Sequence, residues 1–187
     1  MNPEDVNSSL RSSMSISSMW IGFHLRAYST SPSWHSRTLF TTEGEHVNTY
    51  RAERDILADP ATVASIILNI GELADWNPAL IATRTNDRVA IVDHPYSVST
   101  RIPGRATLTY VQANADRIVW RLDAGGSVET GEWDLYLRGR ATRVVHTMTH
   151  GGALFALMQR AMTPVPTWRL DRLQQRAEAR ASSTGIS

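Results

Sequence analysis

Residues 117–150 read RIVWRLDAGGSVETGEWDLYLRGRATRVVHTMTH and carry most of the information about the architecture. Apolar side chains such as Trp120 and Leu122 recur at every second position, which is the period of a half-buried strand. Gly125-Gly126 and Gly139-Arg140 divide the stretch into strands at 117–123, 128–138 and 141–150. Strands joined by turns this short must be antiparallel neighbours, because parallel pairs need long crossovers.

Upstream of this stretch, the same alternation predicts further strands at 47–57, 79–86, 89–93, 96–102 and 105–111. Two short helices separate the first of these strands from the others. Asp59-Pro60 opens one helix, because Asp accepts hydrogen bonds from the first-turn amides and Pro has no N–H to satisfy there. Glu72–Trp76 forms the second helix, which Asn77-Pro78 ends.

Downstream, the period changes from two residues to that of a helix. Gly151-Gly152 ends the last strand, and apolar residues then recur at helical spacing from Leu154 to Val165. Thr163-Pro164-Val165-Pro166 predicts a kink or an interruption. The helix resumes over 168–181, with a side that we expect to face solvent and that carries Arg169, Arg172, Arg176 and Arg180. Since the alternating strands leave one apolar face, this helix is the element that should cover it.

The order of elements resembles the helix-grip fold of the SRPBCC superfamily, which includes START-like lipid-binding proteins and bacterial polyketide cyclase/dehydrase-like proteins. Several segments carry the resemblance over residues 46–181: Arg54–Val63 as first strand and helix, Leu73–Pro78 as a Trp-x-Pro turn, and Arg117–Leu122, Gly131–Trp133 and Ala141–Val144 as later strands. The resemblance implies an α+β domain whose curved antiparallel sheet wraps a long C-terminal helix. It also implies a ligand cavity between sheet and helix.

The chain is expected to have three parts. Residues 1–44 are rich in Ser and Thr and lack a lasting period, which predicts a disordered or poorly packed extension. A transit peptide and a lid that docks through Trp20, Trp34 and Phe40 are the alternatives for this segment. Residues 45–181 form the SRPBCC-like ligand-binding domain, and 182–187 are expected to be a disordered tail.

Composition excludes several kinds of chemistry. All 19 basic residues are Arg and Cys is absent, so a Schiff-base lysine, a P-loop lysine and thiolate catalysis are ruled out. The formal net charge of +1 gives no electrostatic case for a nucleic-acid partner. We expect no cofactor, no metal and no transmembrane segment, a cytoplasmic location, and a chain that could form a homodimer.

Seven residues are candidates for contact with a hydrophobic ligand: Trp76, Tyr96, Tyr110, Trp120, His146, Met148 and Met158. Trp rings can stack on an aromatic molecule, Tyr hydroxyls and His can meet a ligand oxygen, and Met supplies an adaptable wall. Each can equally be an ordinary core residue. His146 and His150 lie about 13 Å apart along a strand, too far to chelate one metal ion.

Three functions remain open at this point. The first is binding of a hydrophobic small molecule, such as a lipid, polyketide or aromatic metabolite, in the implied cavity. The second is a polyketide cyclase/dehydrase-like enzyme, for which His146 with Tyr96 or Tyr110 is the pairing to test. The third is a protein-interaction module without a ligand, which would have a filled core and an apolar surface patch.

Overall fold

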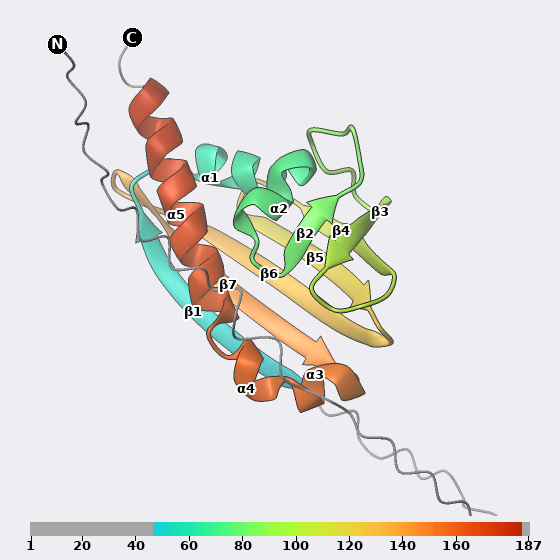
Figure 1. Cartoon of the computed structure of the whole chain (residues 1–187). Coiled ribbons are helices and arrows are strands. Elements are labelled where there is room, and N and C mark those ends of the chain that lie inside the picture. The colour runs from blue at the N-terminus through green and yellow to red at the C-terminus, as the bar shows by residue number, and fades with distance from the viewer. Residues whose placement is uncertain (1–46, 185–187) are drawn as a thin grey trace, which may run out of the picture. The chain divides into compact units, whose positions relative to one another are not determined.

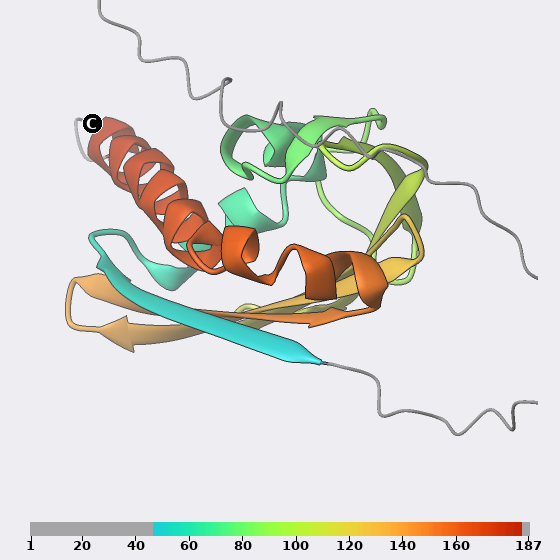
Figure 2. The same cartoon turned by 60° about the horizontal axis from the view of Figure 1, so that its bottom comes forward.

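A computed structural model describes residues 47–184, and these residues build one curved antiparallel sheet with all helices on one of its faces (Figures 1 and 2). The strands are β1 (Asn48–Ile56), β2 (Leu80–Thr83), β3 (Pro95–Thr100), β4 (Ala106–Ala113), β5 (Arg117–Ala124), β6 (Ser127–Arg138) and β7 (Ala141–Gly151). They lie in the order β1-β7-β6-β5-β4-β3-β2. Every neighbouring pair is antiparallel, as the short turns predicted for consecutive strands, and the pairing of β1 with β7 adds a contact between distant parts of the chain.

The helices follow the expected positions. They are α1 (Pro60–Ile67), the 3-10 helix η2 (Ile70–Glu72), α2 (Leu73–Trp76), α3 (Ala153–Leu157), α4 (Gln159–Met162) and α5 (Val165–Thr184). Asp59 caps α1 by accepting a hydrogen bond of 2.9 Å from the Thr62 amide. The interruption near Pro164 is confirmed, since α5 begins at Val165 with Pro166 in its first turn, where no N–H is needed. The helix continues past Ala181, where the sequence predicted its end, to Thr184.

The sheet curves around α5, and Figure 2 shows α5 lying along its concave face. This is the helix-grip fold that the resemblance implied. The apolar parity of each strand faces inward: on β6, for example, Trp133 and Leu135 are buried. None of the helices in residues 47–184 combines the length and the apolar character that crossing a membrane requires.

One expected strand does not form. Residues 89–93 make only an isolated bridge, from Val92 to Tyr110. The amide of Ala90 donates instead to the carbonyl of Leu68, and Asp93 has a φ of 59°, which turns the chain out of an extended path. The expected strand at 79–86 is likewise shortened to β2.

The interior contains two separate apolar clusters. The larger lies between the sheet and α1, α2 and α5, and includes Trp76, Trp120 and Trp133. The smaller lies where α3 and α4 meet the sheet, and consists of Met148, Phe155, Met162 and Val165 with Tyr50, Ile102 and Met158 packed against it.

The predictions for residues 1–44, including the lid and the transit peptide, lie outside the described residues.

Candidate functional site

A group of buried polar side chains lies beneath α5. Its members, called the polar layer below, are Asn77, Glu129, His146, His150 and Arg169, and each is at most 2 % exposed. Asn77 follows α2, Glu129 lies on β6, His146 and His150 lie on β7, and Arg169 lies on α5. Charged side chains are almost never fully buried unless they are paired, so this layer needs an explanation.

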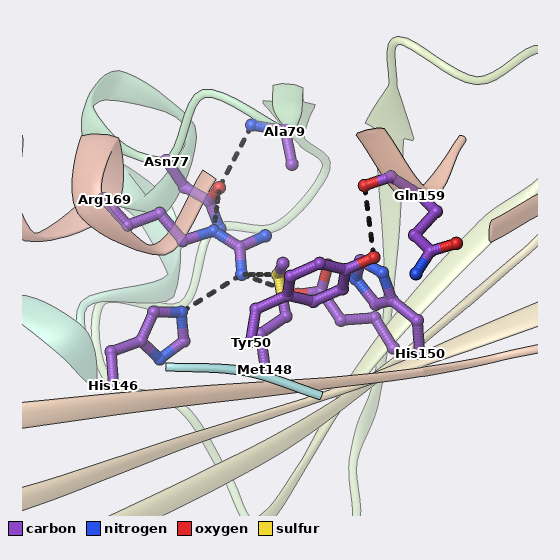
Figure 3. Close-up of polar contacts among 9 residues, drawn as sticks. Tyr50, Asn77, Ala79, His146, Met148, His150, Gln159 and Arg169 are labelled. Carbon is purple, nitrogen blue, oxygen red and sulfur yellow. Dashed lines mark hydrogen bonds and ion pairs between the residues drawn. The ribbon is translucent and has the colours of Figure 1, made fainter. Parts of the chain in front are cut away.

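Arg169 holds the polar layer together (Figure 3). Its Nε donates to Asn77 Oδ1 at 3.1 Å, and its Nη1 donates to Glu129 Oε1 at 2.7 Å. Nη1 also lies 3.3 Å from His146 Nε2 and 3.3 Å from Met148 Sδ. The remaining nitrogen, Nη2, is buried and has no hydrogen-bond partner among the described residues. Arg169 therefore uses part of its donor capacity for the fold and leaves two N–H groups unused.

The placement of Arg169 corrects the sequence interpretation, which put it on the solvated side of the helix. Arg172 is exposed, but Arg169 is not. The reason is helical geometry: Arg169 lies four residues after Val165 and four before Leu173, and both of these are buried. The sequence feature that indicates this burial is a charged residue within a row of apolar residues at helical spacing.

Glu129 is the anionic partner in the layer. Its Oε1 accepts from Arg169 and its Oε2 accepts from His150 Nε2 at 3.1 Å. Burial alone would raise the pKa of Glu129, but the charge of Arg169 and the hydrogen bonds from His150 and Arg169 outweigh burial and lower it well below its usual range. Glu129 is therefore ionised, and because a carboxylate can only accept, His150 Nε2 carries a proton. In a neutral imidazole this leaves Nδ1 as an acceptor, and it has no partner.

His146 is buried and neutral. Burial and then the charge of Arg169 lower its pKa to about 3. Its Nδ1 lies 2.9 Å from the Glu132 carbonyl, which can only accept, so the proton is on Nδ1 and the lone pair of Nε2 faces Arg169. This arrangement leaves His146 poorly suited to take up a proton at neutral pH.

Aromatic rings enclose one side of the layer. Trp133 stacks on His146, its partner across β6 and β7, with ring centroids 3.6 Å apart. Trp120 meets Trp133 edge to face at 5.4 Å, and the guanidinium carbon of Arg169 lies 5.7 Å from the Trp120 ring. Trp76 meets Trp133 at 5.8 Å. The sequence candidates Trp120 and His146 are therefore brought to Arg169, and Trp76 joins the group through Trp133.

The hydroxyl groups of the two candidate tyrosines are bonded elsewhere in the protein. Tyr110 donates its hydroxyl to the Ile67 carbonyl at 2.7 Å, and the hydroxyl of Tyr96 accepts from the Ile91 amide at 2.9 Å. Neither hydroxyl is bonded to His146, so the predicted His–Tyr pairing is absent among the described residues. Burial raises the pKa of Tyr110, which keeps its phenol protonated. Met148 contacts Arg169, and Met158 is half-buried beside the smaller cluster.

Side chains occupy the space beneath α5 in this structure. Trp76, Trp120, Trp133, Tyr110 and Phe155 are each at most 2 % exposed. A ligand in this region must therefore displace side chains instead of entering an open cavity. In the described part of the chain, no three His, Cys, Asp or Glu side chains are grouped so that they could hold a metal ion.

Comparisons with known proteins support the architecture. No family model matches the chain, and no curated protein matches it by sequence. Among solved structures, a hypothetical protein from Helicobacter pylori has a TM-score of 0.59 at 12% identity, covering 81% of this chain and 99% of that one. Norcoclaurine synthase from Thalictrum flavum has a TM-score of 0.57 at 8% identity, covering 80% and 97%. The Zhui aromatase/cyclase from Streptomyces sp. R1128 has a TM-score of 0.55 at 17% identity, covering 75% and 99%.

These similarities define the class of structure. The chain has a helix-grip fold, which it shares with the Zhui aromatase/cyclase and with norcoclaurine synthase. At these identities the likeness establishes the fold alone, so function has to be argued from the site.

Proposed function

We propose that the protein binds a hydrophobic small molecule, such as a lipid, polyketide or aromatic metabolite, between the concave face of the sheet and the segment formed by α3, α4 and α5. One observation carries the proposal: a buried polar layer with an unpartnered Arg169 Nη2 contacts both apolar clusters, the larger through Trp120 and Trp133 and the smaller through Met148 and Phe155. An unsatisfied buried donor destabilises a protein, and a site that accepts a ligand oxygen is one reason to keep it.

The smaller apolar cluster supplies the region that can rearrange. It contains Met148, Met158 and Met162, whose unbranched side chains repack more easily than branched ones. The short helices α3 and α4 cover it, and the Tyr50 hydroxyl donates to the Gln159 carbonyl at 3.2 Å (Figure 3). Displacement of this segment would open the polar layer without disturbing the three Trp residues.

The proposed contacts follow from this geometry. Trp76, Trp120, His146, Met148 and Met158 would line the ligand near the polar layer. Tyr96 and Tyr110 would contribute their rings only, since their hydroxyls are bonded within the protein.

Native mass spectrometry of the protein purified from its own host tests the proposal, followed by denaturing extraction of bound molecules. Two neighbouring substitutions provide a matched pair: Met158→Trp adds bulk in the proposed site, whereas Leu157→Trp adds the same bulk at a position that is 85% exposed. We expect a co-purifying apolar molecule that is lost from Met158→Trp and retained by Leu157→Trp. Equal retention by both variants would place the molecule elsewhere and refute the proposed site.

A second candidate is a cyclase/dehydrase-like enzyme, and the Glu129–His150 pair favours it. Glu129 orients the His150 ring through Nε2, which leaves Nδ1 as a buried acceptor able to take a proton from a carbon next to a carbonyl. The Arg169 charge would stabilise the resulting enolate oxygen. The base in this candidate is therefore His150 and not His146.

Deuterium exchange distinguishes this enzyme from a binding protein. The acetyl protons of 2-acetylnaphthalene should exchange with deuterated water faster with the protein than with buffer, and His150→Gln should remove the acceleration. Exchange at the buffer rate with the wild-type protein would reject the enzyme and leave the binding function standing.

A further inference from the structure

The polar layer and the rings around it contain more unused donors than acceptors. The buried side-chain atoms that lack a partner in the described part of the chain are Arg169 Nη2, Trp76 Nε1, Trp133 Nε1 and His150 Nδ1. The first three are donors whatever the protonation of the protein, because neither guanidinium nor indole nitrogen accepts. A ligand that satisfies this region must therefore bring oxygen acceptors.

The charges of the layer balance when both of its imidazoles are neutral. Arg169 and Glu129 form an ion pair in which both side chains are at most 1% exposed. His146 adds no charge at neutral pH, and His150 adds none when only its Nε2 carries a proton. A ligand anion would introduce a second negative charge into a region of low polarity with one cation, which is strongly unfavourable. An uncharged acceptor would use Nη2 without changing the balance.

The surroundings of the Arg169 guanidinium also restrict the part of the ligand that carries the acceptor. The guanidinium carbon of Arg169 lies 5.7 Å from the centre of the Trp120 ring, and its Nη1 contacts Met148 of the smaller cluster at 3.3 Å. Any group that reaches Nη2 from that cluster is surrounded by apolar and aromatic side chains. The acceptor must therefore be carried by an apolar body.

We propose that Arg169 Nη2 binds the carbonyl oxygen of an uncharged ligand, a ketone, quinone or ester on an apolar ring system, and that the site disfavours carboxylates such as free fatty acids. This inference rests on the proposed binding function and narrows its substrate class. It assigns specificity to Arg169, a residue outside the set that the sequence singled out.

Three naphthalenes of nearly equal shape test the assignment: 2-acetylnaphthalene carries a ketone, 2-naphthoate a carboxylate, and 2-ethylnaphthalene no oxygen. Their dissociation constants are measured by equilibrium dialysis against the full chain. The test variant is Arg169→Met combined with Glu129→Gln, which removes both charges together. Arg172→Met is the matched control, because Arg172 is exposed on the same helix.

The decisive quantity is the ratio of ketone affinity to hydrocarbon affinity, in which differences in hydration cancel between protein variants. We expect this ratio to fall at least tenfold in the double variant and to stay unchanged in Arg172→Met. The hydrocarbon should bind all three proteins with similar affinity, which also shows that the double variant is folded. In the wild-type protein, the carboxylate should bind more weakly than the ketone.

Each alternative result has a distinct meaning. A ratio that stays constant while the hydrocarbon binds would refute the role of Arg169, as expected if Nη2 only meets a buried water, and would leave the binding function intact. Tighter binding of the carboxylate than of the ketone would overturn the uncharged class. If none of the three compounds binds the wild-type protein, the proposed binding function fails, and this inference fails with it.

Discussion

Replacing Arg169 and Glu129 singly and together should reveal how strongly the fold depends on their pairing. Nη1 and Oε1 are 2.7 Å apart, and both side chains are at most 1% exposed. Removing one partner of a buried pair leaves an uncompensated charge and destabilises a protein by about 3–5 kcal/mol. We therefore expect losses of this size for Arg169→Met and for Glu129→Gln. The double variant should lose less than the sum of the two, by at least about 2 kcal/mol.

Urea unfolding followed by circular dichroism measures these free energies by linear extrapolation. The comparison needs a fixed pH near 7, where Glu129 is ionised in the wild-type protein because its pKa is lowered. Independent sites usually give additive losses to within about 0.5 kcal/mol. Additive losses would show that the two residues do not stabilise one another, and would refute the account of the polar layer.

Three further predictions concern the stability of the fold that surrounds the site. The pKa of His146 is about 6.5 in the unfolded chain and about 3 in the folded chain. The stability that this difference contributes is therefore fully present above pH 6.5 and is lost as the pH falls to about 3. Between pH 7 and 5, urea unfolding should show a loss of about 2 kcal/mol from this group, which His146→Gln removes and His94→Gln does not. Gly131→Ala should destabilise by about 3 kcal/mol in the same assay, since a Cβ there would lie 2.2 Å from Trp120 Nε1; a neutral effect would contradict the packing. Asp59→Ala should lower the thermal midpoint through a loss of about 1 kcal/mol at the α1 cap, whereas an unchanged midpoint would mean that this cap adds nothing.

The fold could be predicted because its signals are local. Turns such as Gly139-Arg140 fix antiparallel pairing, and the period of two tells which side of each strand faces the helix. The sequence failed at 89–93, where the apolar residues suggested a strand. The hydrogen bond from Ala90 to Leu68 that decides the matter joins segments far apart in the chain.

The site was predicted only in its aromatic part. Trp120 and His146 lie close together because both face inward from the sheet, whereas Trp76 reaches the same aromatic group from α2, through Trp133. Glu129 was missed although it shares the inward parity of Trp133 on β6. A charged residue at such a position signals a buried partner, but parity alone does not say which one.

The partner of Glu129 lies forty positions along the chain, on a different element. Only the packing of α5 against the sheet brings Arg169 to it, so the pair is a tertiary feature without a local motif. The sequence nevertheless indicates that Arg169 is buried, because it lies in one helical row with Val165 and Leu173. Reading charged residues within apolar rows as candidates for buried pairs would have found both members.

The most direct test of the account is a crystal structure of the protein with 2-acetylnaphthalene bound. We expect the ring system to lie between the sheet and α5, with Met148 and Met158 displaced and the ketone oxygen within hydrogen-bonding distance of Arg169 Nη2. A ring system bound on the outer surface, with the region beneath α5 packed as in Figure 3, would contradict the proposal that this space is a ligand site.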